Sequence, residues 1–89
     1  MQLPKGFKLK EGVEFDKNLQ RYRWRPKKNN LCYYPKTKTI FKYLDWKAHL
    51  EGTFMSLDGY AKVRDTKTKE VFWTPHLEVR RNCIPIQKR

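Results

Sequence analysis

The stretch DGYAKVRDTKTKEVFW, residues 58–73, decides how the chain folds. Its Asp-Gly pair lies between alternating runs, which is a strong signal for a two-residue hairpin turn. Apolar and polar side chains then alternate through 60–64 and predict a strand, because successive side chains of a strand point to opposite faces. The run DTKTK at 65–69 predicts a turn, and the β-branched and aromatic residues of 70–74 predict the next strand.

Similar patterns elsewhere predict strands at 20–25, 31–34, 39–43 and 53–57, and residues 76–80 are a candidate for a last strand in addition to these. One short helix is expected over 46–51, where Asp45 would cap its start and Gly52 would take the left-handed position after its end.

The predicted fold class is therefore mostly β (α+β). It consists of two antiparallel three-stranded meanders joined by one short helix, in a small curled sheet or a partly open barrel. With 89 residues the chain is expected to form one small basic domain. Residues 1–12 are expected to be a basic arm or a first edge strand, and residues 81–89 a basic tail.

The core is expected to be aromatic, because large rings bury much apolar surface in a short chain. Trp24, Trp46 and Trp73 are all predicted to lie in it. Tyr33 and Tyr34 are neighbours on a strand, so one of them should be buried and the other exposed.

Two cysteines, Cys32 and Cys83, are too few for a secreted disulfide scaffold, so both are expected to be free and buried in a reducing compartment. No apolar run is long enough to span a bilayer, and the opening MQLPKGFKLK lacks the apolar core of a signal peptide. These features predict a cytoplasmic protein, or a nuclear one if the source is eukaryotic.

The charge balance predicts an anionic partner. The chain carries 21 Lys and Arg against 9 Asp and Glu, a net charge of +12. Such a charge strains the compact state by self-repulsion unless a polyanion or an acidic protein relieves it. Residues 1–30 carry +6, residues 31–60 carry +1 and residues 61–89 carry +5. The sequence leaves open whether the two basic blocks meet on one face.

The first candidate surface is the strand at 20–25. Its arginines alternate with Tyr22 and Trp24, so the arginines share one face and the rings share the other. Arginine is preferred where phosphate is held by two parallel hydrogen bonds, which favours a phosphate contact here over an edge strand that is merely kept soluble. The candidate contacts on this first surface are Arg21, Arg23, Arg25, Lys27 and Lys28.

The second candidate surface is the strand at 60–64 and the turn after it. Ala61 and Val63 share one side of this strand, so the other three residues share the opposite side. An aromatic ring beside cations is typical of proteins that bind single strands, although the ring could equally pack on its neighbours. The candidate contacts on this second surface are Tyr60, Lys62, Arg64, Lys67 and Lys69.

These patterns predict a small non-enzymatic nucleic-acid-binding protein, for DNA or RNA, of a composition that suits a phage or mobile-element accessory protein. The alternative is an effector or inhibitor that docks on an acidic surface of a host enzyme or nucleoprotein complex. No catalytic residue, metal, cofactor, membrane or small-molecule substrate is expected. The acidic residues are scattered singly, and the Cys and His spacings fit no close pair of zinc ligands.

Residues 58–73 also resemble the small three-stranded sheets that begin phage-type tyrosine integrases and that AP2-type domains use to read the major groove. The resemblance consists of a strand, a turn with Asp and Thr, and an aromatic-rich strand. It implies a sheet that contacts nucleic acid and assigns a role to no individual residue.

Overall fold

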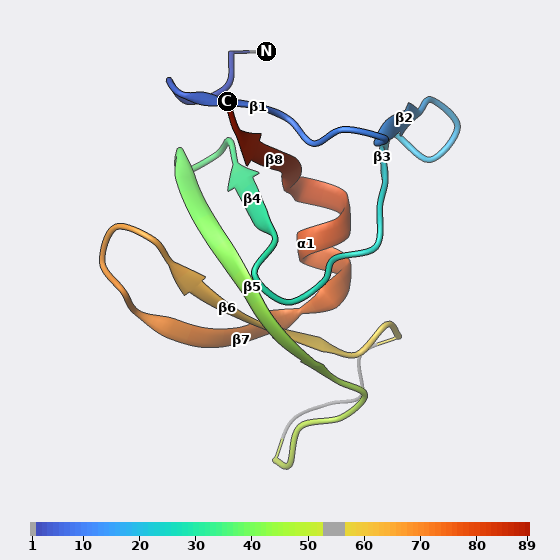
Figure 1. The fold of residues 1–89 in the computed structure, drawn as a ribbon. Helices are drawn as coiled ribbons and strands as arrows, with labels where there is room; N and C mark the ends of the chain where they lie inside the picture. The colour runs from blue at the N-terminus through green and yellow to red at the C-terminus, as the bar shows by residue number, and fades with distance from the viewer. Residues whose placement is uncertain (1, 53–56) are drawn as a thin grey trace.

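The computed structural model, drawn in Figure 1, describes residues 2–52 and 57–89. Over these residues the chain is mostly strand with one short helix, which confirms the predicted fold class. The elements are β1 (Phe7–Leu9), β2 (Glu14–Asp16), β3 (Arg21–Arg23), β4 (Leu31–Tyr34), β5 (Thr39–Lys47), β6 (Tyr60–Asp65), β7 (Val71–Pro75), α1 (His76–Asn82) and β8 (Ile84–Lys88).

The described strands form two antiparallel sheets, one of six strands in the order β1-β8-β4-β5-β6-β7 and one consisting of β2 and β3. Strands β4 to β7 follow one another as a meander. The chain then passes through α1, which lies against one side of the curled sheet, and returns as β8 beside β4 (Figure 1). Strands β1 and β7 are the two edges and do not pair with each other, so the sheet is not closed into a barrel.

Alternation along the strands sorts the apolar side chains into two clusters. One cluster lies beneath α1 and joins the sheet to the helix; its buried members are Trp24, Cys32, Tyr43, Ala61, Val63, Val79 and Cys83. The other consists of Tyr33, Ile84 and Ile86, with Leu3 and Phe7 packed against it. Cys32 and Tyr33 are neighbours in β4 and belong to different clusters, as alternation requires.

The helix predicted at 46–51 is wrong. Trp46 and Lys47 are the last residues of β5, and they pair with Ala61 and Tyr60 of β6. A helix of six residues is marginal on its own, so the pairing with β6 overrides the local signal. Gly52 does adopt the predicted positive φ, at 79°, but it does so in a turn.

The strand predicted at 76–80 is also wrong, because these residues belong to α1. His76, Val79 and Cys83 are buried and are spaced three and four residues apart, the spacing of one helical face. A window of five residues, 76–80, contains only the first of these two spacings, so the helical pattern cannot be recognised within it.

The basic tail predicted at 81–89 is not a tail over most of its length, because Ile84–Lys88 form β8 between β1 and β4. Ile84 and Ile86 are 5% and 2% exposed. Proline is uncommon within a central strand because it donates no hydrogen bond, so Pro85 argued against a strand here. Of the two alternatives for residues 1–12, the edge strand forms as β1.

Three further predictions have different outcomes. Both cysteines are free and buried, as predicted. Among the tryptophans only Trp24 is buried, whereas Trp46 is 49% exposed and Trp73 is half-buried, so their shared placement in the core is wrong. The predicted strand at 53–57 lies, apart from its last residue, outside the described residues.

No helix in the described part of the chain has the length and hydrophobicity to cross a membrane.

The buried position of β8 makes a stability prediction. Ile86→Ala should lower the free energy of unfolding by about 2–5 kcal/mol, because the cavity left in the core cannot fully collapse. Leu9→Ala is the control, since Leu9 pairs directly with Ile86 but is 36% exposed. Urea denaturation measures both. Equal losses in the two variants would mean that β8 is not a buried strand.

Candidate nucleic-acid interface

Strand β6 separates the apolar and the charged side chains of the sheet. Ala61 and Val63 are 0% and 2% exposed in the cluster beneath α1. Tyr60, Lys62 and Arg64 therefore project from the opposite face. The structure thus places these three predicted residues together on the side of the sheet that α1 does not cover.

Strand β5 adds two lysines to this face through a break in its register. Lys42 lies opposite Arg64, and Lys47 lies opposite Tyr60. The two lysines are five positions apart, an odd number, so in a regular strand their side chains would point to opposite faces. The register shift between Tyr43 and Asp45 brings both to the same face.

Strand β7 contributes an indole ring. Trp73 lies opposite Lys62, and the Nζ atoms of Lys47 and Lys62 lie 5.4 and 5.9 Å from the centroid of a Trp73 ring. Both distances lie within the range of cation–π attraction, which restricts the two ammonium groups to the neighbourhood of the ring. We name this surface the basic face; its residues are Lys42, Lys47, Tyr60, Lys62, Arg64 and Trp73.

The cations of the basic face are not neutralised by the protein. Lys42, Lys47, Lys62 and Arg64 form no ion pair with any described residue. One carboxylate, that of Asp45, lies on this face opposite Lys62, and its Oδ1 accepts a hydrogen bond from the backbone N–H of Trp46 at 2.8 Å. The face therefore carries an excess of positive charge towards solvent.

The turn after β6 extends this charge. Asp65 closes the turn by accepting hydrogen bonds from the backbone N–H groups of Lys67 and Thr68, at 2.8 and 3.2 Å. The Lys67 and Lys69 side chains are exposed. Lys69 lines a shallow hollow together with Lys42 of the basic face and Lys88 of β8. Lys69 thus continues the basic face, and Lys67 is exposed in the same turn.

The first predicted surface lies elsewhere. Strand β3 belongs to the two-stranded sheet, where it pairs with β2 and not with β6, and it contacts α1. Trp24 is buried beside it, as the alternation predicts, while Arg25, Lys27 and Lys28 are exposed. The Nε of Arg23 lies 3.1 Å from Oδ2 of Asp16, so this arginine is partly used within the hairpin. The two predicted surfaces are therefore separate, although Arg21 of the first basic block and Arg81 of the last line one hollow.

Sequence reasoning missed three members of the basic face. Lys42 could have been found, because it alternates with Phe41 and Tyr43 in a predicted strand. Lys47 was assigned to the expected helix, and its place depends on a bulge that no local pattern reveals. Trp73 was placed in the core because large rings are usually buried.

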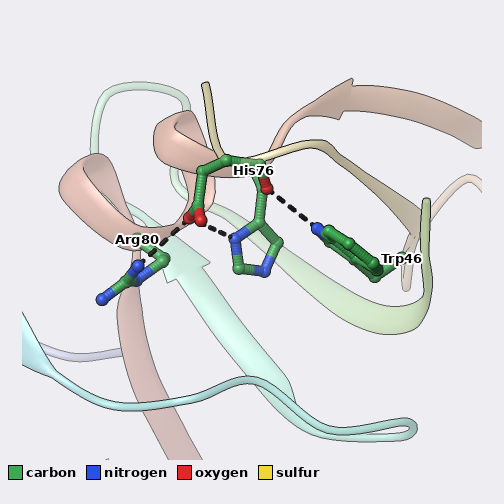
Figure 2. Close-up of polar contacts among 4 residues, drawn as sticks. Trp46, His76 and Arg80 are labelled. Atoms are coloured by element: carbon green, nitrogen blue, oxygen red, sulfur yellow. Dashed lines mark hydrogen bonds and ion pairs between the residues drawn. The ribbon is translucent and has the colours of Figure 1, made fainter. Parts of the chain in front are cut away.

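A polar cluster fixes the end of the β5–β6 connection against α1 (Figure 2). Oδ2 of Asp58 lies 2.9 Å from Nδ1 of His76 and accepts a hydrogen bond from Arg80 at 3.1 Å. The backbone carbonyl of Asp58 accepts a hydrogen bond from Nε1 of Trp46 at 2.8 Å. The bond to His76, and then that to Arg80, lowers the pKa of Asp58. This cluster holds the end of β5 and the start of β6 in register.

No model of a known protein family, no curated protein and no solved structure matches the chain. The resemblance of 58–73 to integrase-type and AP2-type sheets therefore gains no support from these comparisons, and the candidate interface depends on its own geometry.

The polar cluster makes stability depend on pH. Because the folded pKa of Asp58 is lowered, its contribution is present above the unfolded value of about 3.9 and is lost as pH falls through the folded value. Asp58→Asn should lower the free energy of unfolding at pH 7 by at most about 1 kcal/mol, since the carboxylate is partly exposed.

Urea denaturation at pH 7 and at pH 2 measures this effect. The difference between Asp58→Asn and the natural protein should shrink at the lower pH, because a growing fraction of the carboxylate in the natural protein is protonated as the pH falls through its folded pKa. Asp45→Asn, an exposed carboxylate outside the cluster, is the control. A loss in Asp58→Asn that is the same at both pH values would contradict the assignment.

Proposed function

We propose that the protein binds single-stranded nucleic acid through the basic face. The observation that carries this proposal is the gathering of Lys42, Lys47, Lys62 and Arg64 on one side of the sheet, with no ion pair to any described residue. The ammonium groups of Lys47 and Lys62 lie beside the Trp73 ring. Like charges placed this close on a rigid sheet repel one another, and a row of phosphates relieves that repulsion.

The strands supply the spacing that a backbone contact needs. Adjacent strands lie about 4.8 Å apart, and alternate residues of one strand lie about 6.6 Å apart. Lys42 and Arg64 lie opposite each other on β5 and β6, and Lys62 lies two residues before Arg64 on β6. The sheet thus offers a two-dimensional array of cations, along which phosphates of one strand can be bound at several points.

The aromatic members favour a single strand over a duplex. Trp73 and Tyr60 lie among the cations of an open sheet face, whereas the bases of a duplex are stacked on one another and hidden from a flat surface. Proteins that bind single strands combine a charged groove for the backbone with rings on which bases stack. The exposed residues of the first predicted surface are not part of this proposal.

The salt dependence of binding tests the phosphate contacts. Lys62→Gln/Arg64→Gln should weaken binding to a single-stranded oligonucleotide. It should also reduce the slope of log affinity against log salt by about 1.4, because each lost phosphate contact lowers the slope by about 0.7. Fluorescence anisotropy across a salt series measures the slope.

The matched control is Arg23→Gln/Arg25→Gln, which removes the same charge from the first predicted surface. It should leave the slope nearly unchanged. If instead this control flattens the slope and Lys62→Gln/Arg64→Gln does not, the interface is the β3 strand and the proposal fails. Equal affinity for polyglutamate would equally contradict it, because an acidic protein would then suffice as partner.

Trp73 is tested separately from the charges. Trp73→Leu should weaken binding about tenfold at fixed salt, within the range measured for loss of one stacking ring, and should leave the salt slope unchanged because no charge is removed. Phe72→Leu is the control, since Phe72 is 37% exposed and is the neighbour of Trp73 in β7, but pairs with Val63 on the opposite face. An equal loss in both variants would argue against a role of the Trp73 ring.

A further inference from the structure

A second cationic hollow lies outside the basic face. It is formed where the β2–β3 hairpin, the β4–β5 turn and the end of α1 meet, and its volume is about 430 Å³. Its polar lining consists of Gln20, Arg21, Lys36, Arg81 and Asn82. No residue of the basic face lines it, so its ligand need not be the one that the sheet binds.

The charged groups around this hollow have no ion-pair partners within residues 2–52 and 57–89. The three cations come from three different elements, and none of the ion pairs among the described residues uses Arg21, Lys36 or Arg81. No carboxylate lines the hollow. Asp16 pairs with Arg21 across the hairpin, but its Oδ2 lies 3.1 Å from Nε of Arg23. Three positive charges that line one hollow repel one another, so an anion bound between them is favoured.

The remaining polar groups suit an oxyanion. Arginine presents its N–H groups in a planar fork that matches the oxygens of a phosphate. Arg21 and Arg81 line the hollow from two different elements, β3 and α1. The amide of Asn82 adds a neutral donor beside them.

One wall of the hollow is aromatic. Phe15 and Tyr22 lie opposite each other in the hairpin, with ring centroids 5.1 Å apart and an interplanar angle of 67°. Phe15 is 48% exposed, so part of its ring is open to solvent. Tyr22 packs against both apolar clusters, so the wall is anchored to the body of the protein.

We infer that this hollow binds a phosphate monoester joined to a planar ring. The phosphate lies between Arg21, Lys36 and Arg81, and the planar ring lies against Phe15. This chemistry is shared by a free mononucleotide and by the phosphorylated end of a nucleic-acid strand. The inference does not depend on the proposed function, because the residues involved are different.

Chemical-shift mapping tests the inference on the ¹⁵N-labelled full chain. Adenosine 5′-monophosphate, added up to about 10 mM, should shift the backbone amides of residues 20–22, 36 and 81–83 in a saturable manner. Adenosine should not, because it lacks the anion. Failure of the monophosphate to give saturable shifts there, or equal shifts with adenosine, would overturn the inference.

Two matched double variants identify the cations. Arg21→Gln/Arg81→Gln should weaken binding of the monophosphate at least about tenfold, because each variant position loses a charge-assisted hydrogen bond. Arg25→Gln/Lys38→Gln removes the same charge outside the hollow, just after β3 and in the β4–β5 turn, and should change affinity by less than about twofold. Equal losses of affinity in the two double variants would mean that only the net charge of the protein matters, and would overturn the proposed site.

Lys62→Gln/Arg64→Gln separates this inference from the proposed function, because it should leave monophosphate binding intact even where strand binding is lost. Competition by a short oligonucleotide then identifies the source of the phosphate. Displacement only by the 5′-phosphorylated form identifies a strand end, and displacement by neither form identifies a free nucleotide. Displacement by the 5′-hydroxyl form as well would contradict the need for a phosphate monoester.

Discussion

The burial of Ala61 and Val63 beneath α1 fixes which way the sheet faces, and the other features of the molecule depend on it. Both side chains are almost fully buried, so β6 cannot rotate or slip by one residue without moving charge into the core. Lys62 and Arg64 must then face away from the helix. The bulge in β5 brings two further lysines to the same side. Burial on one face thus concentrates charge on the other.

The return of the chain as β8 supplies the second half of the core. A chain of 89 residues buries a modest share of its surface, and Ile84 and Ile86 complete an apolar cluster on the side that α1 does not reach. The β2–β3 hairpin connects the two clusters through Tyr22. These contacts leave two separate cationic surfaces, the basic face and the hollow at the end of α1, and each has its own aromatic wall.

Local alternation predicted much of this fold and little of its assembly. The strand at 31–34 and the turn at 65–69 were found because their signals are complete within a few residues. The helix was misplaced because its face repeats at His76, Val79 and Cys83, beyond a short window, and β8 was missed because Pro85 argues against a central strand. In the candidate interface, Lys62 and Arg64 followed from alternation, whereas Lys47 required the bulge.

The most direct test of the central claim is chemical-shift mapping with a single-stranded oligonucleotide at low salt. Charge concentrated on the basic face predicts that the shifted amides cluster in β5, β6 and β7, around Lys42, Lys47, Lys62, Arg64 and Trp73, and that salt reverses the shifts. Shifts centred on β3 instead, or no shifts at any salt concentration, would contradict the account.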